Sequence, residues 1–213
     1  MKRNSILNNK KGWFIAVFMI VWINSLIGTT DINNWFIENT LTVIALLFLI
    51  ITYKKYRFSN FSYFLICIFL CLHVYGSKYT YADNLFGYWL QAKLDTTRNQ
   101  YDRIVHFSFG LLLYYPIQEL LSKWIKIPKY LALKLPVLII ISASALYEII
   151  EWLVADKFFV AEGASYLGLQ GDVWDSQKDM ALAFLGAVLA AIAMHFYIFS
   201  KKEHNSSEKI IQY

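Results

Sequence analysis

The stretch "LPVLIIISASALYEIIEWLVA", residues 135–155, is long and apolar enough to cross a lipid bilayer as a helix. Such a helix needs about 20 predominantly apolar residues. Two acids, Glu148 and Glu151, interrupt it three positions apart, which puts them on the same side of a helix. If the helix ends near Ala155, Glu148 lies about 10 Å into the membrane, at a rise of about 1.5 Å per residue. This stretch therefore predicts both a membrane fold and a polar site within it.

Five other blocks have the length and composition of membrane spans. They are residues 12–28, 35–53, 61–79, 103–121 and 179–199. The whole chain of 213 residues is 58% hydrophobic and 16% charged, whereas a soluble domain is about half apolar and about one quarter charged. We therefore predict an all-α, polytopic membrane helix bundle with about six transmembrane helices, forming a single integral membrane domain over residues 1–213.

The distribution of basic residues predicts the orientation of the bundle. If both termini are cytoplasmic, 14 of the 20 Lys and Arg residues fall in inner segments, as the positive-inside rule requires. With this topology, 12 of the 15 acids lie at or near the outer side. The basic inner face should contact anionic lipid, so the formal charge of +5 does not indicate a nucleic-acid partner.

The fourth span begins with the stretch "YDRIVHFSFG", residues 101–110, which places an acid and an imidazole one helical turn apart. Asp102 and His106 therefore share a helix face. Arg103 lies off that face, where it can reach lipid headgroups or pair with an acid. Because ionisable groups within a membrane normally face the bundle interior and find partners there, we expect a polar pocket at this depth.

Other polar residues are expected at the same depth. The stretch "GDVWDSQKDM" leads into the last span, and His73 lies in the outer half of the third span; the candidates that these segments add are Asp172, Asp175, Asp179 and His73. Helix capping is a simpler explanation for Asp102, Asp175 and Asp179, since acids are favoured at helix N-termini. It does not explain Glu148, which lies too deep to be a cap.

Several motifs resemble the YjdF-like family of bacterial inner-membrane proteins. They are "HVYGSKYTY" (73–81), "RNQYDRIVHFSFG" (98–110), "ISASALYEIIEW" (141–152) and "LGLQGDVWDSQKDMALAFLGA" (167–187). The resemblance runs from about His73 to Ala187. It implies a multi-pass protein of the bacterial cytoplasmic (inner) membrane, and it supplies no established reaction.

A looser similarity connects the chain to VanZ-like membrane proteins, which are associated with glycopeptide resistance. The elements that correspond are Asp102, Arg103, His106 and Phe107, then Glu148 and Glu151, then Asp175 or Asp179. The long "LGLQGDVWD" loop departs from the simpler VanZ-like pattern, so we do not transfer that role.

Three kinds of function fit these residues. The first is an enzyme or binding site at the outer face for a lipid or a lipid-linked envelope molecule. Its catalytic candidates are Asp102, His106, Glu148 and Glu151, and its substrate-binding candidates are Arg103, Asp172, Asp175, Asp179 and His73. The alternatives are a transporter or proton-coupled carrier, and a non-catalytic membrane scaffold.

The cofactor and the partners are less defined by the sequence. Carboxylates with imidazole suit Zn²⁺ or Mn²⁺. A compact signature such as H-E-x-x-H is absent from the sequence, so a divalent metal is one option and no cofactor is assigned. The expected partner is membrane lipid, and no protein partner is indicated.

Overall fold

The computed structural model describes the backbone of residues 2–158 and 170–211, and the side chains of residues 11–157 and 170–200. Over these residues it contains helices and no strands. The six long helices are α1 (Lys2–Leu26), α2 (Ile32–Tyr53), α3 (Asn60–Ser77), α5 (Tyr101–Glu119), α6 (Lys129–Leu153) and α8 (Asp175–Ile211). A short helix, α4 (Leu85–Leu94), joins α3 to α5, and the π-helical turns η1 (Leu120–Ile125) and η2 (Val154–Phe158) extend α5 and α6.

The long helices correspond to the six predicted spans, and the all-α class is confirmed. Five of them, α2, α3, α5, α6 and α8, are long and apolar enough to cross a membrane. The described apolar part of α1, Lys11–Leu26, is shorter. Helix α4 was not predicted, because the stretch from Leu85 to Leu94 is too short to register as a span.

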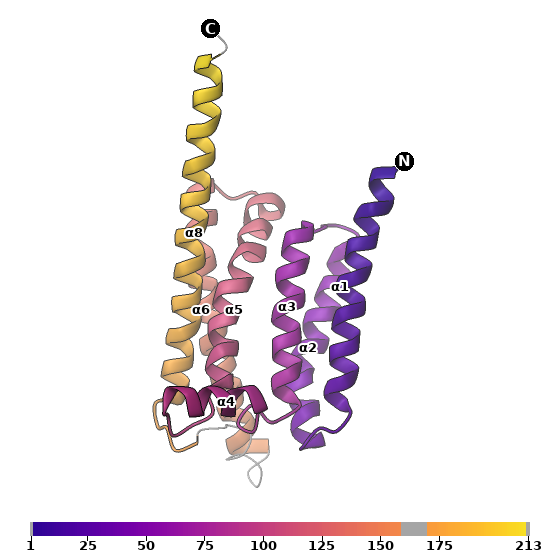
Figure 1. Ribbon diagram of the computed structural model, residues 1–213, viewed down its shortest axis with the longest axis vertical. Helices are drawn as coiled ribbons and strands as arrows, with labels where there is room; N and C mark the ends of the chain where they lie inside the picture. Colours follow the sequence, from indigo (N-terminus) through magenta and orange to yellow (C-terminus); the bar gives the residue numbers. More distant parts are fainter. Residues whose placement is uncertain (1, 159–169, 212–213) are drawn as a thin grey trace.

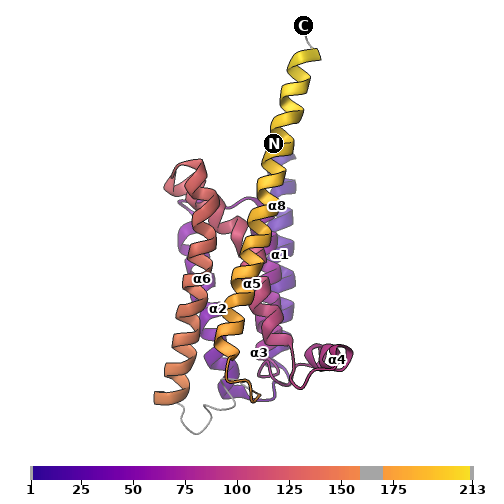
Figure 2. The same cartoon turned by 90° about the vertical axis from the view of Figure 1, so that its left-hand side faces the viewer.

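The helices form two groups that meet along one seam. Figure 1 shows α1, α2 and α3 on one side and α5, α6 and α8 on the other, and α3 of the first group packs against α5 of the second. Aromatic and aliphatic side chains fill the seam; Tyr81, Tyr101 and Val105 are buried there. Both termini lie at the same end of the bundle, and α4 crosses the opposite end (Figures 1 and 2).

Glycines allow α5 and α8 to pack in close backbone contact. A Cβ atom on Gly110 would lie 1.9 Å from the carbonyl oxygen of Ala183, and one on Gly186 would lie 2.2 Å from the carbonyl oxygen of Phe107. Small residues permit this kind of approach between membrane helices, where dispersion contacts drive association. Two alanines of α8, Ala183 and Ala187, are fully buried at this contact.

At the end of the bundle that holds the termini, Glu119 connects α5 to the start of α3. Its carboxylate accepts hydrogen bonds from the backbone N–H of Ser59 (3.0 Å), from the hydroxyls of Ser59 and Ser62, and from Lys123 Nζ (2.8 Å). Lys123 lies four residues after Glu119, which places the two on one helix face. The additional serine donors make Glu119 a saturated structural anchor between the two groups of helices.

We expect Gly110→Ala to destabilise the bundle, because the added methyl group must push α8 away from α5. Overpacking of this kind costs about 1–3 kcal/mol. Thermal unfolding in detergent, followed by size-exclusion chromatography, measures the effect. Gly12→Ala is the matched control, since a Cβ atom there meets nothing within 4 Å. Equal melting temperatures for the two variants would contradict the close packing of α5 and α8.

The positive-inside pattern predicts that the α4 end faces the cell exterior. In a Cys67→Ser, Cys71→Ser background, a membrane-impermeant thiol reagent should label Thr97→Cys in intact cells and should not label Lys55→Cys. Both positions are exposed, and they lie in loops at opposite ends of the bundle. The reverse labelling pattern would show that the bundle has the opposite orientation.

Candidate functional site

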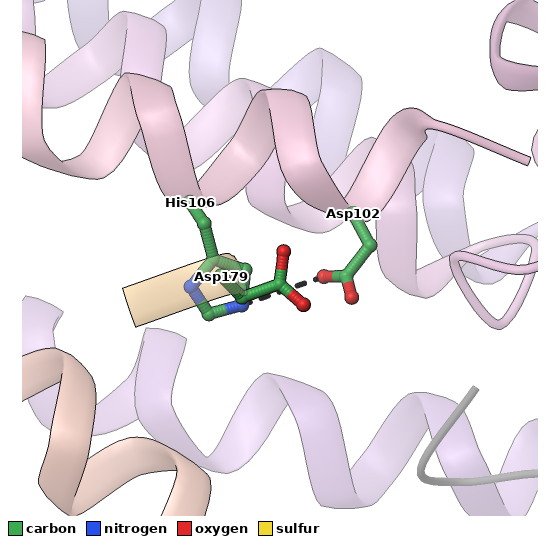
Figure 3. A group of neighbouring side chains, drawn as sticks. All are labelled: Asp102, His106 and Asp179. Carbon is green, nitrogen blue, oxygen red and sulfur yellow. Dashed lines mark ion pairs between the residues drawn. The ribbon is translucent and has the colours of Figure 1, made fainter. Parts of the chain in front are cut away.

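The polar residues of α5, α6 and α8 meet near the α4 end of the bundle. Nε2 of His106 lies 3.5 Å from Oδ1 of Asp102, one turn earlier on α5, and 3.5 Å from Oε1 of Glu148 on α6. Asp179 on α8 completes the group: Asp102, His106 and Asp179 each place one potential ligand atom within 4.8 Å of the others. Figure 3 shows the Asp179 carboxylate directed between the side chains of His106 and Asp102.

This group, which we name the His106 cluster (Asp102, His106, Glu148 and Asp179), is largely buried and incompletely hydrogen-bonded; only the Asp102 side chain, 24% exposed, is more accessible. Asp179 is 2% exposed, and His106 and Glu148 are each 8% exposed. Oδ1 of Asp179 and Oε1 of Glu148 have no hydrogen-bond partner among the described residues. A buried polar atom without a partner costs roughly 1–3 kcal/mol. The cluster therefore has acceptor atoms available for a proton, a cation or a ligand.

Capping does not account for the cluster. The backbone N–H of Tyr101 at the start of α5 bonds the Asn99 side chain (3.0 Å), and the N–H of Trp174 before α8 bonds Asp172 (3.1 Å). These caps leave Asp102 and Asp179 free to face His106 across the contact between α5 and α8.

Two predicted substrate-binding acids are instead engaged in ion pairs. Asp175 pairs with Arg98 and with Arg103 (3.3 Å), and Asp172 pairs with Arg103 (2.5 Å) and Lys178 (2.7 Å). The Lys178 ammonium, the N–H of Trp174 and the Arg103 guanidinium hold the pKa of Asp172 well below its usual range. Burial lowers the pKa of Arg98. These residues connect the segment before α5 to the start of α8, and the structure does not bring them into the His106 cluster.

His73 is also separate from the cluster. Its Nε2 lies 3.2 Å from the backbone carbonyl oxygen of Glu38, and its Nδ1 lies 2.5 Å from the hydroxyl of Tyr81. Thr80 and Tyr81 have left-handed backbone conformations, with φ of 50° and 53°, which are uncommon outside glycine. The strained turn brings the Tyr81 ring back into the bundle against His73.

Glu38 and Tyr147 are site residues that the sequence analysis missed. Glu38 on α2 is 4% exposed and accepts a hydrogen bond from the Tyr147 hydroxyl on α6 (3.3 Å). Glu151, the fourth catalytic candidate, is half-buried and lies near Glu148 and Tyr147. The sequence does contain a signal for Glu38, because Asn34, Glu38 and Thr42 recur every four residues and form a polar stripe along one face of α2.

A cavity of about 370 Å³ lies between α2, α3, α5 and α6. Its walls are mostly apolar and include Leu41, Phe69, Val105, Phe109 and Leu113. Its polar lining includes Thr42, His73, Asp102, His106, Ser144, Tyr81 and Tyr147. The volume falls within the range of ligand pockets, roughly 300–1,000 Å³. The cavity therefore connects the His106 cluster to an apolar chamber within the bundle.

The arrangement supports two kinds of chemistry. An imidazole among three carboxylates can transfer protons as a general acid or base. The same donor set can also bind a divalent cation, for which Asp102, His106 and Asp179 are the candidate ligands.

Comparisons with known proteins agree with the sequence motifs and the fold. The family described as "Predicted membrane protein (DUF2238)" matches residues 11–200. The inner membrane protein YjdF of Escherichia coli (strain K12) is 34% identical over 176 residues, which cover 81% of this chain and 83% of YjdF. No solved structure matches the chain. The resemblance to YjdF is confirmed, and the predicted inner-membrane localisation agrees with this relative. The chain therefore belongs to the DUF2238 family of predicted membrane proteins, together with YjdF.

Proposed function

We propose that the protein binds an amphipathic membrane lipid or a lipid-linked envelope molecule in the cavity, with its polar part directed toward His106. The observation that carries this proposal is the distribution of polarity in the cavity: aliphatic and aromatic walls along most of its surface, and Asp102 and His106 in its lining. An apolar chamber with a few convergent polar groups is typical of small-molecule sites.

Access from the bilayer supports a lipid as the occupant. Leu146 and Ile150 of α6 line the cavity and are 60% and 47% exposed. The cavity wall thus reaches the outer surface of a membrane-spanning helix. A molecule dissolved in the bilayer can enter there without crossing an aqueous phase.

Two hydroxyls in the cavity support an occupant that carries oxygen atoms. Thr42 Oγ1 and Ser144 Oγ are buried and have no hydrogen-bond partner among the described residues, and both residues line the chamber. An ester, hydroxyl or ether group of a bound lipid would satisfy them. A plain hydrocarbon would leave both without a partner, at a cost of roughly 1–3 kcal/mol each.

If the bound molecule is also processed, His106 is the group positioned to act on it. Asp102 lies 3.5 Å from Nε2 and can orient the ring and stabilise its protonated form. Glu148, at the same distance on the other helix, is a second proton acceptor, and Glu151 is adjacent to it. With the orientation predicted by the positive-inside rule, this chemistry takes place in the outer leaflet.

A proton-coupled carrier is the second candidate, favoured by the buried carboxylates Glu38, Glu148 and Asp179 within membrane helices. These groups all lie toward the α4 end of the bundle. At the opposite end the described buried carboxylate is Glu119, which is already saturated with hydrogen bonds. A lipid-binding site explains this one-sided distribution more directly than a path across the membrane. A scaffold role leaves the unpartnered hydroxyls unexplained.

Ser144→Phe tests the proposal, because its ring would fill the cavity. We expect the lipid that copurifies with the protein, identified and quantified by mass spectrometry, to fall at least about tenfold, which corresponds to a loss of about 1.4 kcal/mol. Ser142→Phe is the matched control: it makes the same substitution two residues earlier, at an exposed position outside the cavity lining.

A second variant guards against misfolding. Thr42→Val keeps the side-chain volume and removes one unpartnered hydroxyl, so it should weaken retention of the lipid while preserving the elution profile. Equal lipid content in the parent protein, Ser144→Phe and Thr42→Val would refute the proposed binding site.

A further inference from the structure

We propose that Asp102, His106 and Asp179 bind one divalent cation of the Zn²⁺ or Mn²⁺ class, with Glu148 as a fourth acceptor. Nothing in the family description or in the name of the relative assigns a metal to these positions. The proposal rests on distances, on the pairing of the nearby arginines with other acids and on the unmet acceptor atoms of the cluster.

The distances around His106 are too long for hydrogen bonds and suit ligands of a common ion. Nε2 lies 3.5 Å from Oδ1 of Asp102 and 3.5 Å from Oε1 of Glu148, whereas N–H···O hydrogen bonds span about 2.7–3.2 Å. Ligand atoms placed about 2.0–2.2 Å from a tetrahedral metal are about 3.3–3.6 Å apart. The third ligand atom, from Asp179, lies within 4.8 Å of those of Asp102 and His106, so a small movement closes the site.

The nearby arginines are already paired with other acids. Arg98 pairs with Asp175, and Arg103 pairs with Asp172 and Asp175. Among the described residues, Asp102 and Glu148 form ion pairs only with His106, and Asp179 forms none. Among the described residues, the carboxylates of Asp102, Glu148 and Asp179 therefore have no matching Lys or Arg charge within ion-pair distance, and Arg98 and Arg103 act on Asp179 only at longer range. A bound metal ion would supply that charge.

The unmet acceptor of Asp179 is the independent sign of a ligand. Asp179 is only 2% exposed, and its carboxylate is directed between His106 and Asp102 (Figure 3). Its Oδ1 has no hydrogen-bond partner among the described residues. Glu148 Oε1 is likewise without one. Buried polar atoms are nearly always satisfied, so two unmet carboxylate oxygens beside one imidazole indicate a missing partner.

The supporting helices hold the donors rigidly. Asp102 and His106 project from consecutive turns of α5, and Asp179 lies one turn before Ala183, which contacts Gly110. A mixed imidazole and carboxylate set favours Zn²⁺ or Mn²⁺ over softer ions. Preorganisation by packed helices is what a metal site requires of its supporting structure.

A cation at this position would also define the ligand of the cavity more narrowly. It would add positive charge beside Asp102 and His106, which line the chamber, and would favour an occupant with an anionic oxygen such as the phosphate of a headgroup. This step rests on the proposed lipid-binding function, whereas the metal site itself does not depend on it.

Metal analysis of the purified full-length protein tests the site. The protein carries an affinity tag without histidine, is incubated with Zn²⁺ or Mn²⁺, is passed through a desalting column and is analysed by inductively coupled plasma mass spectrometry. We expect one ion per chain, and a fall to background in Asp179→Asn and in His106→Gln. A chelator should lower the melting temperature of the parent protein and leave that of Asp179→Asn unchanged.

Matched controls separate this site from surface binding and from general loss of acids. Asp83→Asn removes an exposed acid at the same end of the bundle, and Glu119→Gln removes a buried acid at the other end. Both should retain the ion. If Asp179→Asn does not fold, Asp102→Asn is measured in its place.

The outcomes distinguish the two proposals. Ser144→Phe should lose the copurified lipid and keep the metal, because Ser144 is not a ligand. Absence of stoichiometric metal from the parent protein after incubation would overturn the metal site and would indicate that the cluster shares protons instead. Equal metal content in the parent protein and Asp179→Asn would overturn it as well.

Discussion

The close contact between α5 and α8 determines how Asp179 faces His106 and Asp102. Gly110 allows the backbones to approach at Ala183, and Gly186 does the same at Phe107. His106 and Asp179 each lie one turn before the residues of that first contact. The distance between the imidazole and the carboxylate is therefore set by glycine packing rather than by their own interaction. A polar cluster that lacks internal hydrogen bonds needs such external support, because its carboxylates would otherwise repel one another and draw in water.

The polar residues at the α4 end form two groups: in one the charges are paired, and in the other acceptor atoms lack hydrogen-bond partners. Arg98, Arg103, Asp172 and Asp175 neutralise one another and connect the loop before α5 to the start of α8. None of those cations lies within ion-pair distance of the described His106 cluster, although Arg98 and Arg103 interact with Asp179 at longer range. Structural acids in this protein, including Glu119 with its serine and lysine donors, are saturated. The acids facing His106 are not, and this contrast within one molecule is the strongest reason to assign them a ligand-dependent role.

Features governed by a single helix could be predicted from the sequence, whereas features that depend on helix rotation could not. Hydropathy located the long helices, the spacing of Asp102 and His106 placed them on one face, and the depth of Glu148 marked it as a pocket residue. Pairing of Arg103 with an acid was one predicted option, but its partners Asp172 and Asp175 and the participation of Arg98 were not foreseen, because they depend on how a loop folds onto another helix. Glu38 was not predicted as a site residue, because its place in the site depends on α2 facing Tyr147, and the sequence alone does not fix the rotation of α2. The short helix α4 gave no signal of membrane-spanning length.

The seam between the two groups of helices has a mechanical consequence. Asp102, His106, Glu148 and Asp179 all belong to the group formed by α5, α6 and α8, while α2 faces the cavity from the other group. Across the cavity, a hydrogen bond from the Tyr147 hydroxyl to the Glu38 carboxylate, 3.3 Å long, joins α6 to α2. If this hydrogen bond broke, the group formed by α1, α2 and α3 could tilt about the contact between α3 and α5. The cavity would then widen between α2 and α6 and admit a larger ligand. Asp102, His106, Glu148 and Asp179 would keep their positions relative to one another, because all four belong to the group formed by α5, α6 and α8.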